Sequence, residues 1–253
     1  MDFHGFDLKI LFHEEAISRM PDAFSEGRNL REGYIRGAGV QFGNFYNLLN
    51  SDRVLAEANT FSKNQAGALT DEKLGNLYLL IRYFLPKLGK GCIAEFGVNK
   101  GGSALFMARV AKEYMPGTKI YCFDSFAGMP EASANDLHQK GDFDDSEMYL
   151  VDAAKRYGLN NIVIAKGMFC DTVKHQAPKI APILLAHFDG DLYQSTVDCY
   201  EGTLGSMAPQ GYLVFDDAFA SSCTGAFDAV AEYPIRRDGR KPEQIWPHIV
   251  FRS

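Results

Sequence analysis

Apolar positions follow two different spacings along the chain. Over residues 1–69 they recur at helix-like intervals in two stretches, residues 8–12 and 42–49, and no run rich in strand-forming residues interrupts them. We therefore expect residues 1–69 to form an N-terminal cap of helices and loops.

Residues 70–253 alternate between helical and strand patterns and are expected to form the main domain. Thr70 is placed to cap a helix that ends before Pro86. Short apolar runs bounded by Gly, Asp or Pro then have the character of strands buried on both faces, at residues 92–98, 119–124, 161–165, 183–188 and 211–215. Helical patterns separate or follow these runs at residues 103–114, 147–157, 172–178, 196–207 and 226–232. This alternation predicts a parallel sheet with crossover helices.

The C-terminal segment adds two candidate strands. Residues 244–246 and 249–251 fit two final strands, and a hairpin is one arrangement open to this pair. The expected fold is thus an α/β domain with a seven-stranded, mostly parallel sheet and helices on both faces. Residues 130–145, rich in Asp, Gly, Ser and Ala, are expected to form a loop.

Composition narrows the class of protein. Acidic residues outnumber basic ones by 32 to 26, and a net charge of −6 does not favour a nucleic-acid groove. No stretch approaches the roughly 18 apolar residues that a membrane span needs. The five cysteines are widely spaced and contain no C-x-x-C pair, which is typical of reduced thiols. We expect a cytoplasmic protein that binds neither nucleic acid nor membrane.

The turn after the first expected strand has the character of a binding turn. Ligands of open parallel sheets bind at the carboxyl ends of the strands. Here Gly97, Gly101 and Gly102 give a G-x-x-x-G-G spacing, which differs from the G-x-G-x-x-G of dinucleotide-binding turns. The following helix N-terminus favours an anionic group, whereas Glu95 suits a cationic one, so the turn indicates a ligand with both charges. Tight packing of the strand on the helix is the alternative reason for the glycines.

An acidic residue ends the second expected strand. Asp124 lies 27 residues after Gly97 and is placed to accept the hydroxyls of a ribose. Capping of a following helix is its alternative role. Together with the first turn, Asp124 indicates a nucleoside without phosphate.

Four carboxylates follow two later strands: Asp189, Asp191, Asp216 and Asp217. Neighbouring parallel strands would bring them to one edge of the sheet, where their mutual repulsion requires a cation. Oxygen ligands alone select Mg²⁺, with Mn²⁺ or Ca²⁺ as alternatives, whereas Zn²⁺ would require His or Cys. Turn and cap roles are the alternative for each Asp taken singly. His187, within the preceding strand, is expected to be a hydrogen-bonded core residue.

Four motifs together resemble the macrocin O-methyltransferase (TylF/MycF) family of metal-dependent, S-adenosylmethionine-dependent sugar O-methyltransferases from natural-product pathways. The motifs are residues 95–103 (EFGVNKGGS), 123–130 (FDSFAGMP) and 189–196 (DGDLYQST), followed by the pair Asp216 and Asp217. The resemblance covers roughly residues 70–235. It implies a Rossmann-like class I methyltransferase fold.

The resemblance also implies a role for each motif. S-adenosylmethionine would be held by Glu95, Phe96, Gly97, Lys100, Gly101, Gly102, Ser103, Asp124, Ser125, Phe126, Gly167, Met168, Phe169 and Asp189, with Lys166 also beside the adenine. Mg²⁺ would be bound by Asp189, Asp216 and Asp217. A catalytic base is needed as well, and Asp189 and Asp191 are both candidates.

The chain departs from the family pattern at three points. Asn99 and Lys100 replace the more usual aromatic-Arg pair, and Ala218 follows the Asp pair where an aromatic residue is common. Leu192 stands where the related catechol methyltransferases have a Lys. These departures leave the methyl acceptor open.

The expected function is methyl transfer from S-adenosylmethionine to a hydroxyl of a small molecule, such as a sugar or another natural-product intermediate. We expect the enzyme to be a homo-oligomer, a dimer or larger. A metal-dependent glycosyltransferase is the main alternative, since Asp189-Gly190-Asp191 is also a D-x-D sequence, but the acid in the glycine turn would repel the two phosphates of a nucleotide sugar. A catalytically silent nucleotide-binding protein and an NAD-linked oxidoreductase are further alternatives, and the missing G-x-G-x-x-G weakens the latter.

Overall fold

The computed structural model describes residues 52–134, 136–220 and 222–253, together with six short strands within residues 1–51. The chain divides into two units, Met1–Ala56 and Glu57–Ser253. In the first unit the described strands pair antiparallel in twos, β1 (Asp2–Phe3) with β2 (Phe6–Asp7), β3 (Phe24–Ser25) with β4 (Arg28–Asn29), and β5 (Tyr34–Arg36) with β6 (Gly39–Gln41). The helical stretches expected at residues 8–12 and 42–49 lie outside the described residues. The boundary expected at residue 70 stays a prediction.

The second unit is built on a sheet of six strands among the described residues, in the order β12-β11-β10-β7-β8-β9. The strands are β7 (Cys92–Phe96), β8 (Ile120–Asp124), β9 (Ile162–Lys166), β10 (Ile183–Phe188), β11 (Met207–Phe215) and β12 (Ile249–Arg252). All neighbours run parallel except β12, which pairs antiparallel with β11. The mostly parallel α/β sheet predicted from the sequence is confirmed.

The expected seventh strand at residues 244–246 is not formed. Gln244 makes an isolated antiparallel bridge to Val250, and the run goes no further. Pro242 and Pro247 flank it, and because proline has no N–H to donate, neither can extend a ladder. The count of seven strands was therefore one too high.

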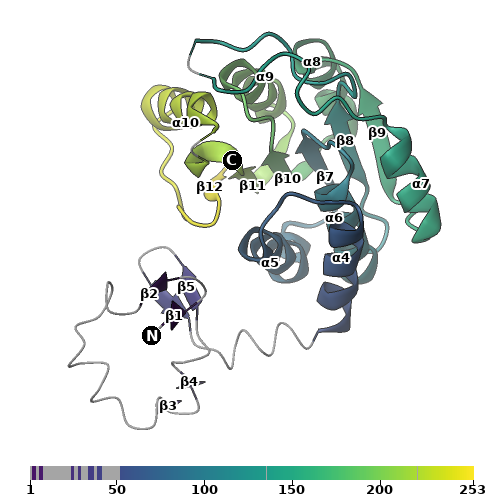
Figure 1. Ribbon diagram of the computed structural model, residues 1–253, viewed down its shortest axis with the longest axis vertical. Coiled ribbons are helices and arrows are strands. Elements are labelled where there is room, and N and C mark those ends of the chain that lie inside the picture. The colour runs from purple at the N-terminus through teal and green to yellow at the C-terminus, as the bar shows by residue number, and fades with distance from the viewer. Residues whose placement is uncertain are drawn as a thin grey trace. The chain divides into compact units, whose positions relative to one another are not determined.

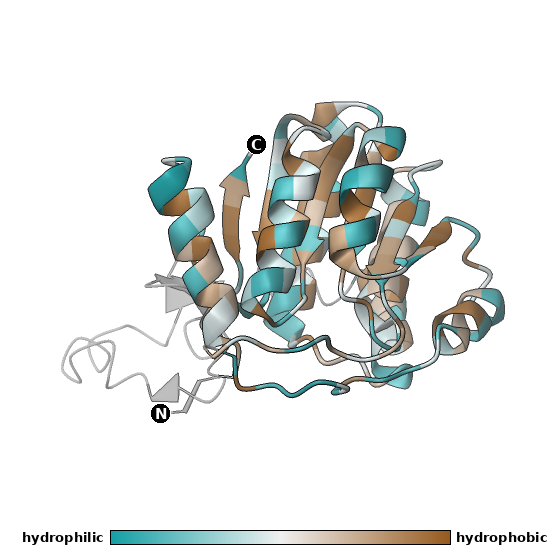
Figure 2. Cartoon of the chain, turned by 90° about the horizontal axis from the view of Figure 1, so that it is seen from above, coloured by the Kyte–Doolittle hydropathy of each residue, from teal (hydrophilic) through white to brown (hydrophobic). Residues whose placement is uncertain are grey.

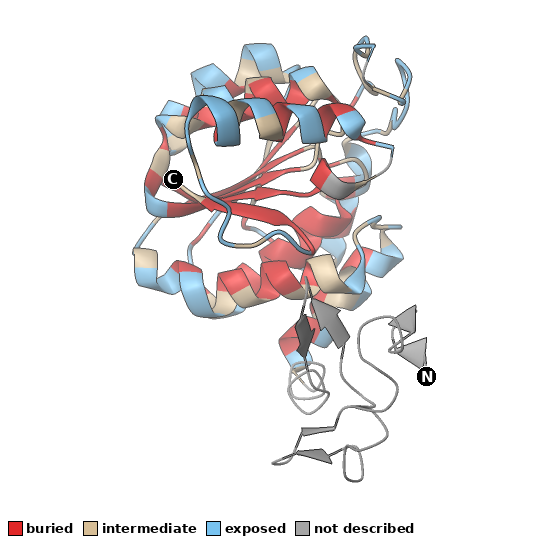
Figure 3. Ribbon diagram, turned by 90° about the vertical axis from the view of Figure 1, so that its left-hand side faces the viewer, coloured by how far each residue is buried: buried red, intermediate tan, exposed pale blue. Residues whose placement is uncertain are grey.

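Helices cover both faces of the sheet (Figure 1). One face carries α5 (Asp71–Leu79), α6 (Gly102–Tyr114) and α7 (Met148–Arg156), and the other carries α8 (Phe169–Ile180), α9 (Tyr193–Leu204) and α10 (Thr224–Val230). α4 (Arg53–Asn64) lies beside α6, to which the ion pair of Glu57 with Arg109 joins it at 2.8 Å. The strands are mostly hydrophobic and buried, while the outer sides of the helices are hydrophilic and exposed (Figures 2 and 3). A parallel sheet is stable only when both faces are covered in this way.

The first helix of the main domain begins where the sequence predicts. The hydroxyl of Thr70 accepts a hydrogen bond from the backbone N–H of Lys73, which caps α5. Near its end the helix widens into a π turn, Leu80–Phe84, and then tightens into the 3-10 turn Leu85–Leu88. Pro86 lies in that last turn and cannot donate a backbone hydrogen bond, so the α-helical pattern stops before it.

A row of phenylalanines crosses the sheet at the carboxyl ends of its strands. Phe123, Phe96, Phe188 and Phe215 come from neighbouring strands and are all buried. Their rings stack in sequence, with centroids 4.9, 5.3 and 4.5 Å apart. Such stacked pairs stabilise a sheet beyond the burial of their surface. The row therefore fixes the backbone position of the residue that follows each phenylalanine at the edge of the sheet.

Backbone hydrogen bonds extend the ladder one residue past this row. Gly97 N–H donates to the carbonyl of Phe123, Asp189 N–H to that of Phe96 and Asp216 N–H to that of Phe188, at 2.8 to 3.0 Å. β7 and β10, far apart in sequence, are neighbours here, and the crossover helices α6 and α9 leave them on opposite faces. This is the switch point at which open α/β sheets bind ligands.

Among the residues that the structure describes, no helix combines the length and the hydrophobicity that a bilayer span requires.

Candidate active site

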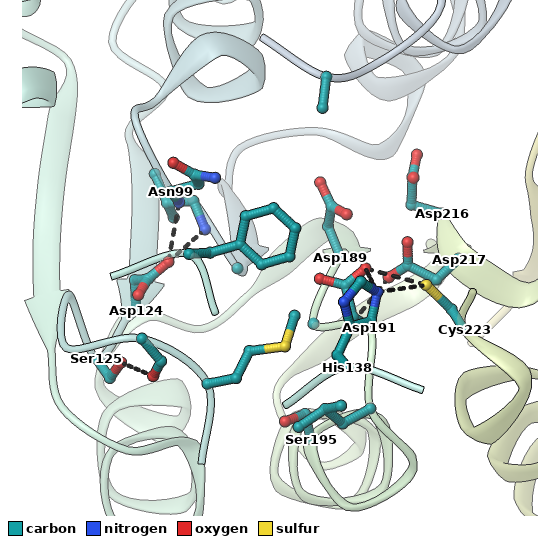
Figure 4. Close-up of a pocket in the computed structure, with 18 of the residues that line it drawn as sticks. Asn99, Asp124, Ser125, His138, Asp189, Asp191, Ser195, Asp216, Asp217 and Cys223 are labelled. Carbon is teal, nitrogen blue, oxygen red and sulfur yellow. Dashed lines mark hydrogen bonds and ion pairs between the residues drawn. The ribbon is translucent and has the colours of Figure 1, made fainter. Parts of the chain in front are cut away.

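A cavity of about 680 Å³ opens at the carboxyl ends of the strands. The turns after β7, β8, β9, β10 and β11 all contribute to its wall, and the loop around Glu131–Phe143 adds more. Figure 4 shows its two sides, with Asn99, Asp124 and Ser125 on one and the later aspartates on the other. A volume of this size suits a ligand of the size of a nucleoside with a side chain.

The glycine turn brings two strand ends into close contact. Gly97 has a φ of 92°, in the left-handed region, and a Cβ atom there would overlap the carbonyl oxygen of Asp189. Gly101, with a φ of 93°, precedes the first turn of α6, and a Cβ on it would press against Leu150. The glycines thus serve the tight packing that was the alternative reason for them, and Gly97 and Gly102 also line the cavity.

Asp124 ties the first two turns together. One of its carboxylate oxygens accepts the N–H groups of Val98 and Asn99, at 2.7 and 3.0 Å, and the other accepts the N–H of Phe126 at 2.8 Å. No helix follows Asp124 in the described part of this turn, so a helix cap is not its role. Its side chain lies at the wall of the cavity (Figure 4).

Three turns at this edge hold residues other than glycine in the left-handed region. Asn99 after β7, Phe126 after β8 and Asp191 after β10 have φ values of 48°, 49° and 58°. Such conformations cost free energy and persist where the surroundings enforce them, most often at functional sites. Their placement after three neighbouring strands indicates that this edge is built for binding.

The residues predicted for S-adenosylmethionine divide into two groups. Those that line the cavity are Gly97, Lys100, Gly102, Ser103, Asp124, Ser125, Gly167, Met168, Phe169 and Asp189. Glu95, Phe96, Gly101 and Phe126 are buried and do not line it. Phe96 belongs to the phenylalanine row, and the carboxylate of Glu95 points to His187 instead.

Three carboxylates form a compact cluster beside the cavity. Oxygens of Asp189, Asp191 and Asp217 all lie within 4.8 Å of one another, and Asp191 N–H donates to Asp217 at 3.0 Å. Burial raises the pKa of Asp189 and of Asp217 well above the usual carboxyl range, and repulsion by neighbouring carboxylates adds to the increase. The predicted gathering of aspartates at one sheet edge is therefore present.

Asp216, the fourth of these aspartates, has nitrogen partners of its own. His248 Nε2 lies 2.9 Å from one of its oxygens and His187 Nε2 lies 3.6 Å away, while Lys73 from α5 bonds the other oxygen. Burial alone would raise the pKa of Asp216, but the contacts with the two histidines hold it well below its usual range. The carboxylates grouped within 4.8 Å of one another are thus Asp189, Asp191 and Asp217. The predicted metal set Asp189, Asp216 and Asp217 stays a prediction.

His187 is the buried, hydrogen-bonded core residue that the sequence predicts. It is fully buried, and its Nδ1 lies 3.1 Å from Glu95. Burial lowers its pKa, but the nearby carboxylates of Asp216 and Glu95 outweigh this and raise the pKa to about 9. Burial lowers the pKa of His248 to about 4, and Asn76 bonds its Nδ1 at 3.0 Å. The surroundings of Asp216 thus shift the pKa values of its two histidine neighbours in opposite directions.

Sequence reasoning missed three residues that the fold brings to the site. Lys73 lies in the first turn of α5, His138 in the loop after β8, and Cys223 just before α10, and all three line the cavity. His138 and Cys223 both approach Asp191 (Figure 4). Only Lys73 had a local signal, because it lies in the first helical turn, three residues after the cap Thr70. His138 and Cys223 stand in irregular segments without a motif.

Comparison with known proteins gives a consistent picture. Residues 64–241 match the family described as Macrocin-O-methyltransferase (TylF). The 8-demethyl-8-(2,3-dimethoxy-alpha-L-rhamnosyl)-tetracenomycin-C 4'-O-methyltransferase of Streptomyces olivaceus is 31% identical over 174 residues, 64% of this chain and 65% of that protein. The Mycinamicin III 3''-O-methyltransferase of Micromonospora griseorubida is 28% identical over 179 residues, 65% and 68% of the two chains. The match thus spans just under two thirds of the first relative's length.

Solved structures share the architecture. The O-methyltransferase NovP superposes with a TM-score of 0.63 at 24% identity, covering 72% of this chain and 79% of its own. The calicheamicin methyltransferase CalS11 superposes with a TM-score of 0.56 at 20% identity, covering 79% and 91%. These similarities confirm the Rossmann-like class I methyltransferase fold. The family match covers most of the chain, and the chain belongs to the macrocin-O-methyltransferase (TylF) family.

Proposed function

We propose that this protein transfers a methyl group from S-adenosylmethionine to a hydroxyl of a small natural-product acceptor, with a divalent metal ion at the site. The observation that carries the proposal is the cavity of about 680 Å³ at the switch point of the sheet, with a glycine turn and Asp124 on one side and three clustered aspartates on the other. The first side suits a cofactor and the second suits the reacting hydroxyl.

The cofactor half of the proposal rests on the turns after β7, β8 and β9. Gly97 and Gly102 let a ligand approach the backbone, and Ser103 stands in the first turn of α6, where N–H groups favour a carboxylate. Asp124 is placed for a ribose, and Met168 and Phe169 offer apolar surface for an adenine. S-adenosylmethionine presents a carboxylate, a ribose and an adenine without phosphate.

The metal half of the proposal rests on the aspartate cluster. Asp189, Asp191 and Asp217 offer only oxygen atoms, and the raised pKa values of Asp189 and Asp217 reflect burial and mutual repulsion that a cation would relieve. Oxygen donors favour Mg²⁺ or a similar hard ion. Asp189 and Asp217 would hold it, and Asp216 would join them if it released Lys73. When bound, such an ion lowers the pKa of an acceptor hydroxyl and fixes its direction.

The chain's own residues would then orient the acceptor and take its proton. The bond between the methyl group and the cofactor's sulfur breaks as the bond between the methyl group and the acceptor oxygen forms. The oxygen must therefore face the methyl group and lose its proton. We assign the base to Asp191 because Asp189 and Asp217 are assigned to the metal ion, which leaves Asp191 as the partly exposed carboxylate of the cluster beside the cavity. The phenylalanine row keeps Asp189 in register with the glycine turn.

A sugar hydroxyl is the acceptor class that we propose. The two relatives described above are named for methylation at the 4' position of a rhamnosyl-tetracenomycin and at the 3'' position of mycinamicin III. The acidic wall of the cavity suits hydrogen-bond donors such as vicinal hydroxyls.

The proposal is tested by mass spectrometry of a panel of glycosylated natural products incubated with the protein, S-adenosylmethionine and Mg²⁺. We expect an acceptor to gain the mass of one methylene group, excess chelator to abolish the gain and added Mg²⁺ to restore it. Asp191→Asn is expected to lower kcat by about 10²- to 10⁴-fold. Asp198→Asn, which changes a cavity residue outside the cluster, is the matched control. Full activity in excess chelator would refute the metal half.

A further inference from the structure

A second group of metal-binding side chains lies next to the aspartate cluster. His138, Asp191 and Cys223 each offer a donor atom, and these atoms all lie within 4.8 Å of one another. Three separate parts of the chain supply them: the loop after β8, the turn after β10 and the residue before α10. Figure 4 shows the imidazole and the thiol both directed at the carboxylate of Asp191.

The spacing of the three atoms suits a tetrahedral ion. Cys223 Sγ lies 3.1 Å from Asp191 Oδ1 and 3.7 Å from His138 Nε2, and His138 Nε2 lies 4.0 Å from Asp191 Oδ1. A tetrahedral zinc ion with ordinary bond lengths separates neighbouring S, N and O donors by about 3.3 to 3.6 Å. To complete three corners of such a site and leave the fourth to water, the His138–Asp191 separation would have to shorten by about 0.7 Å, and the two separations that involve sulfur would change by less.

Groups behind the donors already hold two of them in place. Asp142 Oδ2 lies 3.6 Å from Nδ1 of His138, the ring atom opposite the donor, and carboxylates in this position orient metal-binding histidines. The left-handed turn at Asp191 is fixed by the hydrogen bond from its N–H to Asp217. Cys223 is only 2% exposed, so its thiol is held inside the cavity wall. The site therefore needs little rearrangement to bind an ion.

The chemistry of the donors separates this group from the aspartate cluster. Nitrogen and sulfur ligands favour Zn²⁺, Co²⁺ or Cd²⁺, whereas Mg²⁺ prefers the oxygens of Asp189 and Asp217. Asp191 belongs to both groups. An ion on the nitrogen and sulfur side would occupy the carboxylate that is otherwise directed at the acceptor.

We propose that His138, Asp191 and Cys223 form a binding site for a borderline or soft divalent cation such as Zn²⁺, distinct from the Mg²⁺ position. The Cys223 thiol gives up its proton to solvent when the ion binds. Binding joins the loop that carries His138 to the start of α10 across the mouth of the cavity. It also inhibits methyl transfer by occupying Asp191, and this consequence alone rests on the proposed function.

The binding claim is tested with cobalt as the probe. Full-length protein in excess Mg²⁺ is titrated with Co²⁺, and the near-ultraviolet absorption that a cobalt-thiolate bond produces is followed. We expect a saturable band with one Co²⁺ per chain, displaced by Zn²⁺. Cys223→Ser should abolish the band and His138→Gln should weaken Co²⁺ binding at least tenfold. Cys170→Ser removes a cavity thiol that belongs to no donor group among the described residues, and it should keep the band.

The outcomes decide the proposal without reference to activity. Absence of the band in the wild-type protein, its survival in folded Cys223→Ser, or its loss in Cys170→Ser would each overturn the site. If Cys223→Ser does not fold, the His138→Gln variant decides. A tenfold loss of its affinity for Co²⁺ would support the site, and an affinity equal to that of the wild-type protein would refute it.

Inhibition is measured separately, where an acceptor is known. The Zn²⁺ concentration that halves each protein's own zinc-free rate should rise at least tenfold in His138→Gln, and an unchanged value would refute the inhibitory role. Because the absorption band needs no acceptor, failure of methyl transfer and failure of the cation site give different results.

Discussion

Gly97 is the residue at which the fold and the site constrain each other most. It needs a left-handed φ of 92°, it lines the cavity, and a Cβ atom on it would overlap the backbone of Asp189. The overlap is with a carbonyl oxygen in the neighbouring strand's turn, which cannot rotate away as a side chain could. A substitution here therefore separates the two strand ends on which the site depends.

We expect Gly97→Ala to lower the free energy of unfolding by at least about 2 kcal/mol more than Gly89→Ala. Gly89 is the matched control, because it has a similar φ of 90° but open space where a Cβ would stand. The strain of a positive φ is present at both positions and should cost on the order of 1–3 kcal/mol at each. Urea denaturation measures both variants. Equal costs would show that contact with Asp189 does not matter.

Residues of the site were predictable where they stand at a strand end. Gly97, Asp124 and Asp189 directly follow or end buried apolar runs, and the parallel sheet brings such positions together whatever the loops do. The partners of Asp216 were not predictable. His248 and Lys73 reach it from distant parts of the chain, and no local pattern links them to Asp216.

At the scale of elements, the phenylalanine row supports the site, because the site residues directly follow it at the ends of the strands. Phe96 stacks on Phe123 and Phe188 and is 0% exposed, and it does not line the cavity. The family resemblance implied that Phe96 contacts the cofactor, which stays a prediction. The structure gives it an indirect role, in which it aligns the ends of β7, β8 and β10.

Phe96→Leu is expected to lower the free energy of unfolding by about 1–3 kcal/mol, because it removes two stacked pairs and leaves a void in the row. The affinity of the folded protein for S-adenosylhomocysteine should stay within about threefold of wild type, which is less than 1 kcal/mol. Denaturation and calorimetry give the two values. Phe227→Leu, on the exposed side of α10, should change stability by no more than about 0.5 kcal/mol. A stable Phe96→Leu variant that has lost cofactor binding would instead favour direct contact.

Most elements were predictable because their apolar patterns agree with their tertiary setting. β10 reads as a continuous apolar run and is buried along its whole length. Residues 244–246 carry the same kind of pattern, but flanking prolines prevent the ladder, so local apolar character alone gave one strand too many. Helix ends shifted by a few residues where π turns or 3-10 turns extend them, as at Leu80–Phe84.

For the whole molecule, the order of the strands in the sheet determines which residues meet at the cavity. The switch between β7 and β10 places the glycine turn, Asp124 and the aspartates around one cavity, although they are spread over residues 97–217. The alternation of elements predicted the parallel sheet, and the family match agrees with it. Loop positions such as His138 depend on long-range packing that no local pattern contains.

S-adenosylmethionine is the cofactor that we propose for this cavity. Titration calorimetry of the full-length protein with S-adenosylhomocysteine, in the presence of Mg²⁺, tests it most directly, with a uridine diphosphate sugar and NADH as competing ligands. We predict saturable binding of one S-adenosylhomocysteine per chain and no measurable heat from the other two. Tight binding of the nucleotide sugar together with no binding of S-adenosylhomocysteine would contradict the account.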